Sequence, residues 1–187
     1  HNAFTSPCGS KPMDPVAVSK YLSYLLRHHP EGLDMDRRGY APVGQVIERL
    51  RERFPAIDRQ RLRQLVDDSD RQRFDIKDDK IRARYGHSIS VSIDWPIADD
   101  VAVLYHGTTR QAAQPILREG LQPRGRQMVH LSATPGEARR VGERHGTPVV
   151  LCIDAAAARR QNVTFYQATE KVYLAAYVPA SCISRMD

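Results

Sequence analysis

Hydrophobic residues recur at helical spacing through the first third of the chain. Between residues 15 and 29 they fall at steps of three and four, which predicts an amphipathic helix with one buried stripe. The same spacing predicts a second helix over residues 42–54 and a third that begins at the N-cap residue Asp58. Residues 73–85 then alternate around a Lys-Asp-Asp-Lys turn, which predicts a hairpin. Three helices and a hairpin are the order of a winged-helix module. The first predicted stripe consists of Val18, Tyr21, Leu22, Leu25 and His29.

After residue 86 the apolar runs become short and are separated by turn residues, which is typical of β-strands. Two short helices are predicted among them, over residues 110–120 with Gly120 as the stop, and over residues 136–146. So few helices argue against a doubly wound parallel sheet, because each parallel strand needs a crossover. We therefore expect an α+β fold. The predicted strands are residues 89–93, 101–105, 128–132, 148–153, 163–166 and 171–178.

This pattern divides the chain into three parts. Residues 1–13 lack periodicity and an initiator Met, and we expect a tag or a disordered leader there. Residues 14–92 form the predicted N-terminal lobe and residues 93–187 the C-terminal lobe. Residues 93–100 are expected to be the surface connector between them.

Composition narrows the classes of protein. A hydrophobic content of 41% with 27% charged residues is typical of a soluble globular protein. The net charge of +6 favours an anionic partner, with nucleic acid first. No apolar run reaches the length of a membrane span and no signal peptide is visible, so a cytoplasmic protein without a membrane partner is expected. Cys8, Cys152 and Cys182 form no CxxC pair, which argues against a disulfide framework, and no metal site is expected.

Arginine and histidine gather at the ends of the predicted elements. Arg27 and His28 close the first helix, where cations also suit the carbonyl end of a helix, so alone they predict only capping. Arg126, Met128, His130 and Ser132 alternate and are expected on one face of a strand. No phosphate loop or nucleophile elbow is present. Such side chains suit phosphate binding and the stabilisation of developing negative charge.

Eight motifs, in this order, resemble those of the NAD-dependent RNA 2′-phosphotransferases (tRNA 2′-phosphotransferase, the KptA family). The resemblance covers residues 19–179, which is nearly the whole chain. The motifs are "SKYLSYLLRHHP", "DRRGYAPVGQVI", "DSDRQRFDI", "IRARYGHSISV", "LYHGTT", "GLQPRGRQMVHLS", "VGERHG" and "KVYLAAYVP".

The resemblance implies a winged-helix-like N-terminal lobe that binds RNA and a C-terminal lobe like the ADP-ribosyltransferases that binds NAD⁺. It implies a two-step reaction in which an internal RNA 2′-phosphate attacks the nicotinamide ribose of NAD⁺ and expels nicotinamide. The 2″-hydroxyl of that ribose then attacks the phosphorus, giving 2′-hydroxyl RNA and ADP-ribose 1″,2″-cyclic phosphate. NAD⁺ would be a co-substrate, no metal would be needed, and a monomeric enzyme of tRNA splicing or RNA repair is expected.

The family's functional residues can be carried over position by position. The chain departs from the family at Arg71, where many members have lysine, and a planar guanidinium does not replace an ammonium in geometry. The resemblance implies a catalytic set of Arg27, His28, Arg73 and Arg126, a dinucleotide-binding set of His106, Gly107, Thr108, His130 and Ser132, and RNA phosphate contacts by Lys20 and Arg71.

Two other functions fit parts of the pattern. A winged-helix regulator that binds duplex DNA would use the basic hairpin, but it leaves Arg27, His28 and Arg126 unexplained as a set. An ADP-ribosyltransferase that stops after the first step would mark phosphorylated nucleic-acid ends or a protein. Product analysis separates these, since the first consumes no NAD⁺ and the second retains an ADP-ribose adduct.

Overall fold

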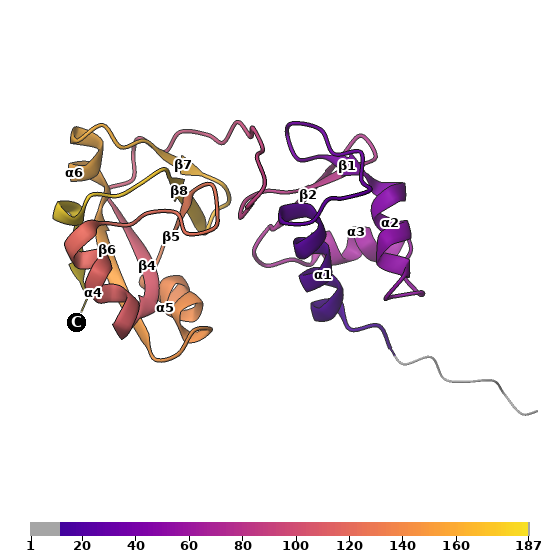
Figure 1. Cartoon of the computed structure of the whole chain (residues 1–187), viewed down its shortest axis with the longest axis horizontal. Helices are drawn as coiled ribbons and strands as arrows, with labels where there is room; N and C mark the ends of the chain where they lie inside the picture. Colours follow the sequence, from indigo (N-terminus) through magenta and orange to yellow (C-terminus); the bar gives the residue numbers. More distant parts are fainter. Residues whose placement is uncertain (1–11, 187) are drawn as a thin grey trace, which may run out of the picture.

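The computed structural model describes residues 12–186, which form two lobes (Figure 1). Each lobe has its own hydrophobic core. The first core is built from residues between 18 and 83, and the second from residues between 98 and 183. The predicted leader lies outside the described residues except for Pro12 and Met13. Met13 packs against the first core, so the folded part begins within the predicted leader.

The N-terminal lobe contains the predicted three helices and hairpin. Its three strands form an antiparallel sheet in the order β1-β3-β2. Asp14 caps the first helix, and its side chain accepts a hydrogen bond from the N–H of Val16. Asp58 caps the third helix as predicted, accepting from the N–H of Arg61. The elements are α1 (Pro15–Arg27), β1 (Ala41–Pro42), α2 (Val43–Arg51), α3 (Arg59–Asp67), β2 (Phe74–Lys77) and β3 (Lys80–Ala83).

The end of α1 differs from the prediction. The helix stops at Arg27, and His28 leaves the helical conformation with φ −130°. His29 is exposed, and the stripe includes the fully buried Leu26 instead. The physical reason is Pro30, whose ring disfavours helical backbone at the residue before it.

The C-terminal lobe is a six-stranded antiparallel sheet in the order β7-β8-β5-β4-β6-β9. Together with the first lobe this confirms the α+β fold, and the absence of parallel pairing among the described strands agrees with the argument against a doubly wound sheet. Its elements are β4 (Val103–Thr109), α4 (Arg110–Glu119), β5 (Val129–Ser132), α5 (Pro135–Glu143), β6 (Pro148–Asp154), α6 (Ala155–Arg160), β7 (Phe165–Gln167), β8 (Val172–Ala175), the 3₁₀ turn η1 (Ala180–Cys182) and β9 (Ile183–Arg185).

Several predicted boundaries in this lobe are wrong. Residues 89–93 form no strand, because their hydrogen bonds go to loops: Ser92 N–H donates to the Arg37 carbonyl, and the carbonyl of Val91 accepts from the Gln127 side chain. The fifth strand begins only at Val129, so Arg126 lies in the bend before it rather than on a strand face. Helix α5 ends at Glu143 rather than at Gly146, and α6 and β9 were not predicted.

Residues 84–97 join the lobes and carry no helix or strand; we call them the connecting segment. A single bridge, Ile97 to Tyr166, attaches its end to the second sheet. No helix in the described part of the chain combines the length and apolar character needed to span a membrane. Cys152 and Cys182 are free thiols, and Cys8 lies outside the described residues.

Candidate active site

Arg27, the last residue of α1, lies where the two lobes meet. Its Nε and Nη2 atoms are buried and have no hydrogen-bond partner among the described residues. The guanidinium lies 5.0 Å from the centroid of the Tyr85 ring. Gly86 passes beside it with φ +91°, and a Cβ at that glycine would stand 3.2 Å from Nε. The connecting segment therefore covers a cation and supplies no acceptor for two of its nitrogens.

Two more arginines act on this group. Burial, followed by the charges of Arg126 and Arg73, lowers the pKa of Arg27 to about 10, although Tyr85 partly opposes the shift. Arg73 precedes β2 in the N-terminal lobe, and its Nη1 lies 3.4 Å from Ser19 Oγ. Arg126 comes from the C-terminal lobe, in the bend before β5. We call Arg27, Arg73 and Arg126 the arginine cluster.

The arginine cluster has no counter-ion within the part of the chain that the structure describes. Among the ion pairs within residues 12–186, none involves a member of the cluster. Like charges placed together, one of them buried, are unfavourable unless an anion joins them. Guanidinium groups present forked N–H donors that match phosphate oxygens. This arrangement therefore fits a phosphate-sized anion.

His28 stands next to the cluster and is anchored to the connecting segment. Its Nδ1 lies 2.8 Å from Ser88 Oγ, and the N–H of Ser88 donates to the carbonyl of Arg27. Burial and the charges of Arg27 and Arg126 lower the pKa of His28 below its ordinary value. A neutral imidazole with Nδ1 engaged retains Nε2 as a group that can bind or carry a proton.

His130 and His106 form a pair on the C-terminal lobe. His106 Nδ1 lies 2.9 Å from the carbonyl oxygen of His130, and a carbonyl only accepts, so the proton of His106 is on Nδ1. Burial lowers the pKa of His106. Burial, then the charges of Arg126 and Arg27, lowers the pKa of His130 to about 3. The buried Nε2 of His130 has no partner among the described residues, and the Tyr85 ring lies 5.8 Å from its ring.

The predicted dinucleotide-binding residues do not all share one face of the sheet. Tyr105 pairs directly with Ser132, so Gly107 and His130, two residues from each, lie on their face. His106 and Thr108 lie on the opposite face.

The packing of a helix on the strand, rather than the approach of a ligand, explains why Gly107 is a glycine. A Cβ at Gly107 would stand 1.6 Å from the carbonyl oxygen of Ala138 in α5. Gly107 thus lets α5 pack directly on β4. Thr108 and Ser132 are buried.

Lys20 and Arg71 are not among the charged residues that act on Arg27. Lys20 is exposed on α1, seven residues before Arg27 and so on a similar side of the helix. Arg71 is half-buried in the turn between α3 and β2. Neither makes an ion pair among the described residues.

Tyr85, Gly86, His87 and Ser88 were not predicted as site residues, yet they hold the two lobes together. The His87 carbonyl accepts the N–H of Gln127, which fixes the bend that carries Arg126. The His87 side chain is buried and its Nε2 has no partner among residues 12–186; burial, then Arg27 and His28, lowers its pKa to about 4. The available signal was the sequence "YGHS" directly after a predicted strand, with a glycine suited to a sharp turn.

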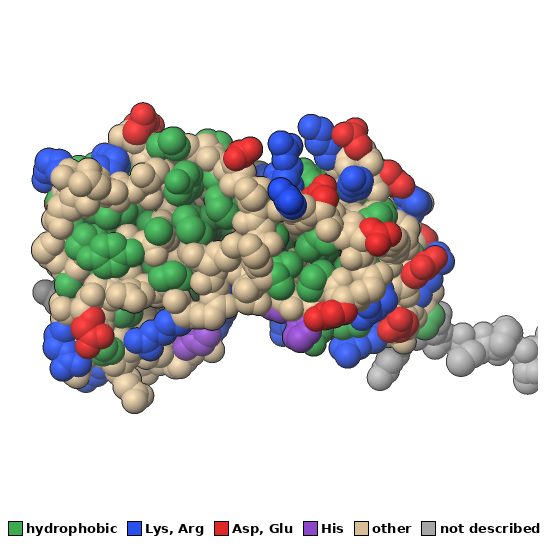
Figure 2. Space-filling model, turned by 45° about the horizontal axis from the view of Figure 1, so that its top comes forward, with side chains coloured by type: hydrophobic (Ala, Val, Ile, Leu, Met, Phe, Trp, Pro, Cys, Tyr) green, Lys and Arg blue, Asp and Glu red, His purple; other side chains and the backbone are tan. Residues whose placement is uncertain are grey.

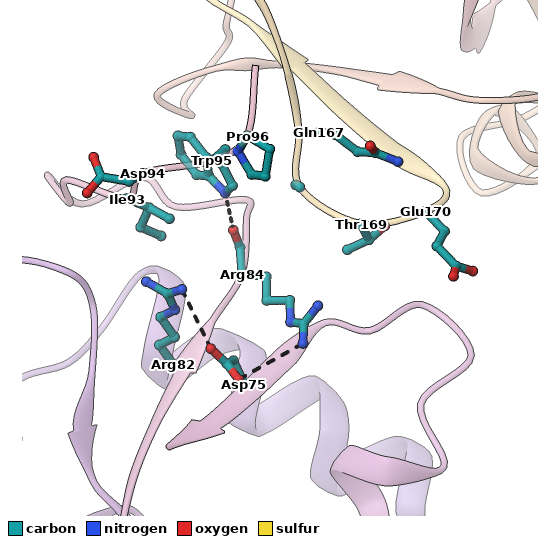
Figure 3. A pocket seen from close by; sticks show the side chains of 11 residues that line it. Asp75, Arg82, Arg84, Ile93, Asp94, Trp95, Pro96, Gln167, Thr169 and Glu170 are labelled. Atoms are coloured by element: carbon teal, nitrogen blue, oxygen red, sulfur yellow. Dashed lines mark hydrogen bonds and ion pairs between the residues drawn. The ribbon is translucent and has the colours of Figure 1, made fainter. Parts of the chain in front are cut away.

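A separate cavity lies elsewhere between the lobes. It has a volume of about 420 Å³ and is lined by the hairpin, residues 93–96 of the connecting segment and residues 167–170 (Figure 3). Its two arginines, Arg82 and Arg84, lie 3.5 and 4.0 Å from the carboxylate of Asp75. Because that pair already has a counter-ion, this cavity differs from the arginine cluster, where the predicted residues meet.

Histidine and basic side chains are exposed on the surface of both lobes (Figure 2). Histidine side chains lie on both sides of the notch between the lobes, with Lys and Arg side chains nearby (Figure 2). Within residues 12–186 no group of three or more His, Cys, Asp or Glu side chains is arranged to hold a metal ion.

Comparison with known proteins agrees with this chemistry. A family model described as RNA 2′-phosphotransferase, Tpt1 / KptA family, matches residues 13–177. The chain belongs to this family. A probable RNA 2′-phosphotransferase of Agrobacterium fabrum is 42% identical over 173 residues, which are 90% of this chain and 93% of the relative. A protein of the same description from Thermococcus kodakarensis is 40% identical over 170 residues, 89% of this chain and 94% of the relative.

The match to the RNA 2′-phosphotransferase family includes both lobes. It begins at Met13, the first residue that packs on the N-terminal core, and ends two residues after β8. The family assignment therefore rests on the two lobes together, including the connecting segment and every member of the arginine cluster.

Proposed function

We propose that this chain is an enzyme that transfers an internal RNA 2′-phosphate to NAD⁺. The products would be 2′-hydroxyl RNA, nicotinamide and ADP-ribose 1″,2″-cyclic phosphate. The observation that carries this proposal is the arginine cluster, with three guanidinium groups from both lobes and no ion pair to a carboxylate among residues 12–186. An RNA 2′-phosphate is a dianionic, forked acceptor of the kind that such a cluster binds.

In the first step an oxygen of the 2′-phosphate attacks the anomeric carbon of the nicotinamide ribose. The glycosidic C–N bond breaks, and nicotinamide leaves as a neutral molecule with the bonding electrons, so no general acid is needed. The protein's task is to hold the phosphate in line with a carbon that becomes positively charged. Arg27 is suited to that task because Tyr85 and Gly86 hold its guanidinium in a fixed position.

In the second step the 2″-hydroxyl attacks the phosphorus, and the bond from phosphorus to the RNA 2′-oxygen breaks. The hydroxyl proton is transferred overall to the departing RNA oxygen. Negative charge grows on the phosphoryl oxygens, and guanidinium donors aimed at them lower the barrier. The imidazole of His28 is suited to accept the hydroxyl proton, because burial and the charge of Arg27 lower its pKa and so favour its neutral form.

We place RNA on the N-terminal, winged-helix-like lobe and NAD⁺ on the C-terminal lobe, as in the ADP-ribosyltransferases that it resembles. The C-terminal lobe offers the imidazole of His130 for this, because its Nε2 has no partner among the described residues. That neutral ring is suited to hydrogen-bond a ribose hydroxyl without adding charge. His106, on the opposite face of the sheet, donates from Nδ1 to the carbonyl of His130 and so holds the backbone that carries it.

The decisive experiment mixes the protein with NAD⁺ and an RNA that carries one internal 2′-phosphate. We expect nicotinamide, a 2′-hydroxyl RNA and the cyclic product in equal amounts. The matched RNA without the 2′-phosphate should consume no NAD⁺. An ADP-ribose adduct that persists on the RNA would show that the reaction ends after the first step, and an absence of NAD⁺ consumption would refute the proposal.

A further inference from the structure

Aromatic rings form a continuous stack from the core-packed Tyr21 of α1 to the exposed His29 beyond its end. The rings of Tyr21 and Tyr24 are nearly parallel, with centroids 6.1 Å apart and planes 15° apart. His29 continues the stack on Tyr24, with centroids 4.4 Å apart and planes 22° apart. At the other end the guanidinium of Arg53 lies 4.0 Å from the centroid of Tyr21.

The stack packs against the hydrophobic core at Tyr21 and is open at the His29 end. The α1 residues in the core are Val18, Leu22, Leu25 and Leu26, all fully buried. Tyr24 is 44% exposed, and 51% of the His29 side chain is exposed. One face of His29 covers Tyr24, so its accessible area belongs to the other face and to the ring edges. A further flat ring can therefore be added there without displacing core residues.

This open end adjoins the candidate active site. The carbonyl of Tyr24 accepts the N–H groups of both His28 and His29, so one backbone group fixes the backbone of both residues. Lys20, Tyr24 and His28 follow one another at intervals of four residues, which places them along one side of the helix end. A strand whose phosphate is held beside His28 would bring its next base towards Tyr24 and His29.

We propose that Tyr24 and His29 form a stacking site for the base of a nucleotide next to the one that carries the 2′-phosphate. This proposal rests on the proposed function, since it assumes RNA at the arginine cluster. Every nucleobase has a flat face that stacks on aromatic rings, so the site tolerates any base. It selects unpaired RNA, because bases within a duplex are already stacked and are not free to turn outward.

The charges around the stack suit this occupant. Lys20 and Arg53 are exposed cations that flank the aromatic rings and can approach the backbone phosphates. Among the described ion pairs, the carboxylate at this end is that of Glu31, 3.6 Å from His29 Nδ1, at the ring edge rather than over the face. An aromatic face with cations at its sides is the usual construction of a single-strand binding surface.

The test uses a short single-stranded RNA with one internal 2′-phosphate and 2-aminopurine as the neighbouring base. Stacking quenches 2-aminopurine fluorescence, so binding is measured directly without NAD⁺. We expect quenching with the unmodified protein and with H29F, which keeps a flat ring. H29A and Y24L should lose most of the quenching and weaken binding about tenfold. Y177L, a change at a comparably exposed tyrosine of the other lobe, is the matched control and should behave like the parent.

A second RNA with an abasic site in place of the neighbouring base separates stacking from other effects. The unmodified protein should bind this RNA about tenfold more weakly, and H29A should weaken its binding no further. In single-turnover reactions with NAD⁺, the control Y177L should retain the parent's rate of nicotinamide release. The stacking site would be overturned if H29A quenched 2-aminopurine as strongly as the parent does. It would also be overturned if H29A weakened the binding of the abasic RNA as much as that of the complete RNA. Failure of the parent to release nicotinamide, with quenching intact, would instead refute the proposed function.

Discussion

Arg27 is a buried cation in an unfavourable place. Two of its nitrogens have no partner among the described residues, and burial, followed by the charges of Arg126 and Arg73, lowers its pKa to about 10. A buried charge without a counter-ion costs stability, and local interactions do not explain why a helix would end in one. Binding of an anion would remove both costs. The free protein therefore stores free energy at Arg27 that an anionic ligand can recover.

The first prediction separates function from stability at this residue. R27M replaces the guanidinium by an apolar side chain of similar length, and it should lower turnover about 10²-fold or more. The same change should leave the free energy of unfolding equal or raise it by about 1 kcal/mol, because an unpartnered charge is removed. Nicotinamide release and urea unfolding measure the two effects.

R118M is the control for that prediction, since Arg118 is largely exposed on α4. It should change neither quantity appreciably. A strongly destabilised R27M that retains turnover would contradict the storage of free energy at Arg27.

The second prediction concerns pH. Burial lowers the pKa of His130 to about 3 and that of His87 to about 4, from an ordinary value of 6.5. Below pH 6.5 the unfolded chain binds protons that the folded chain does not, so stability falls as the pH falls from 6.5 towards 4. At pH 5 each histidine should cost about 2 kcal/mol relative to pH 7. In H87L the loss of unfolding free energy between pH 7 and pH 5 should be smaller by about that amount, measured by urea unfolding.

At the scale of elements, the sequence pattern predicts the helices and turns that are stabilised by interactions between residues close in the chain. The helices with strong periodicity, the Asp58 cap and the hairpin could be read from spacing, because each depends on neighbours within a few residues. Residues 89–93 have the alternation of a strand but no adjacent strand in the fold, which no local pattern records. Helix α6 is too short to give a periodic signal.

The third prediction tests the contact between α5 and β4. G107A should lower the free energy of unfolding by about 3 kcal/mol, because the added methyl group would overlap the Ala138 carbonyl and the helix would have to move. G136A lies in the first turn of the same helix, with nothing within 4 Å of the added Cβ. It should be neutral or stabilising by about 1 kcal/mol. Urea unfolding measures the free energy of unfolding of both variants. Equal stability of G107A and G136A would contradict the close packing of α5 on β4.

At the scale of the whole molecule, the site depends on how two cores meet. The resemblance identified Arg27, Arg73 and Arg126 from motifs, and the structure brings their charges within reach of one another. It did not reveal that Tyr85 and His87 hold this meeting point, because their partners, His130 and Gln127, lie some forty residues further along the chain. Spacing within a motif predicts the residue types at a site, while contacts between lobes depend on the folded arrangement.

The fourth prediction follows from the shared anion site. Inorganic phosphate should raise the thermal unfolding temperature of the parent protein, because a ligand that binds only the folded state stabilises it by mass action. The rise should disappear in R126A as well as in R27M, although these residues belong to different lobes. Sodium chloride at equal ionic strength is the control for screening. A phosphate response that survives both changes would place the anion elsewhere.

Trp95 is the sole tryptophan of the chain. It lies in the connecting segment at the wall of the cavity between the lobes, and its indole N–H donates to the Arg84 carbonyl at 2.7 Å. Indole emission depends on the water and the dipoles around the ring. Trp95 is therefore an intrinsic fluorescence probe at the junction between the two lobes. A shift in the wavelength of its emission maximum on addition of either substrate would report a change in the relative orientation of the lobes, without any added label.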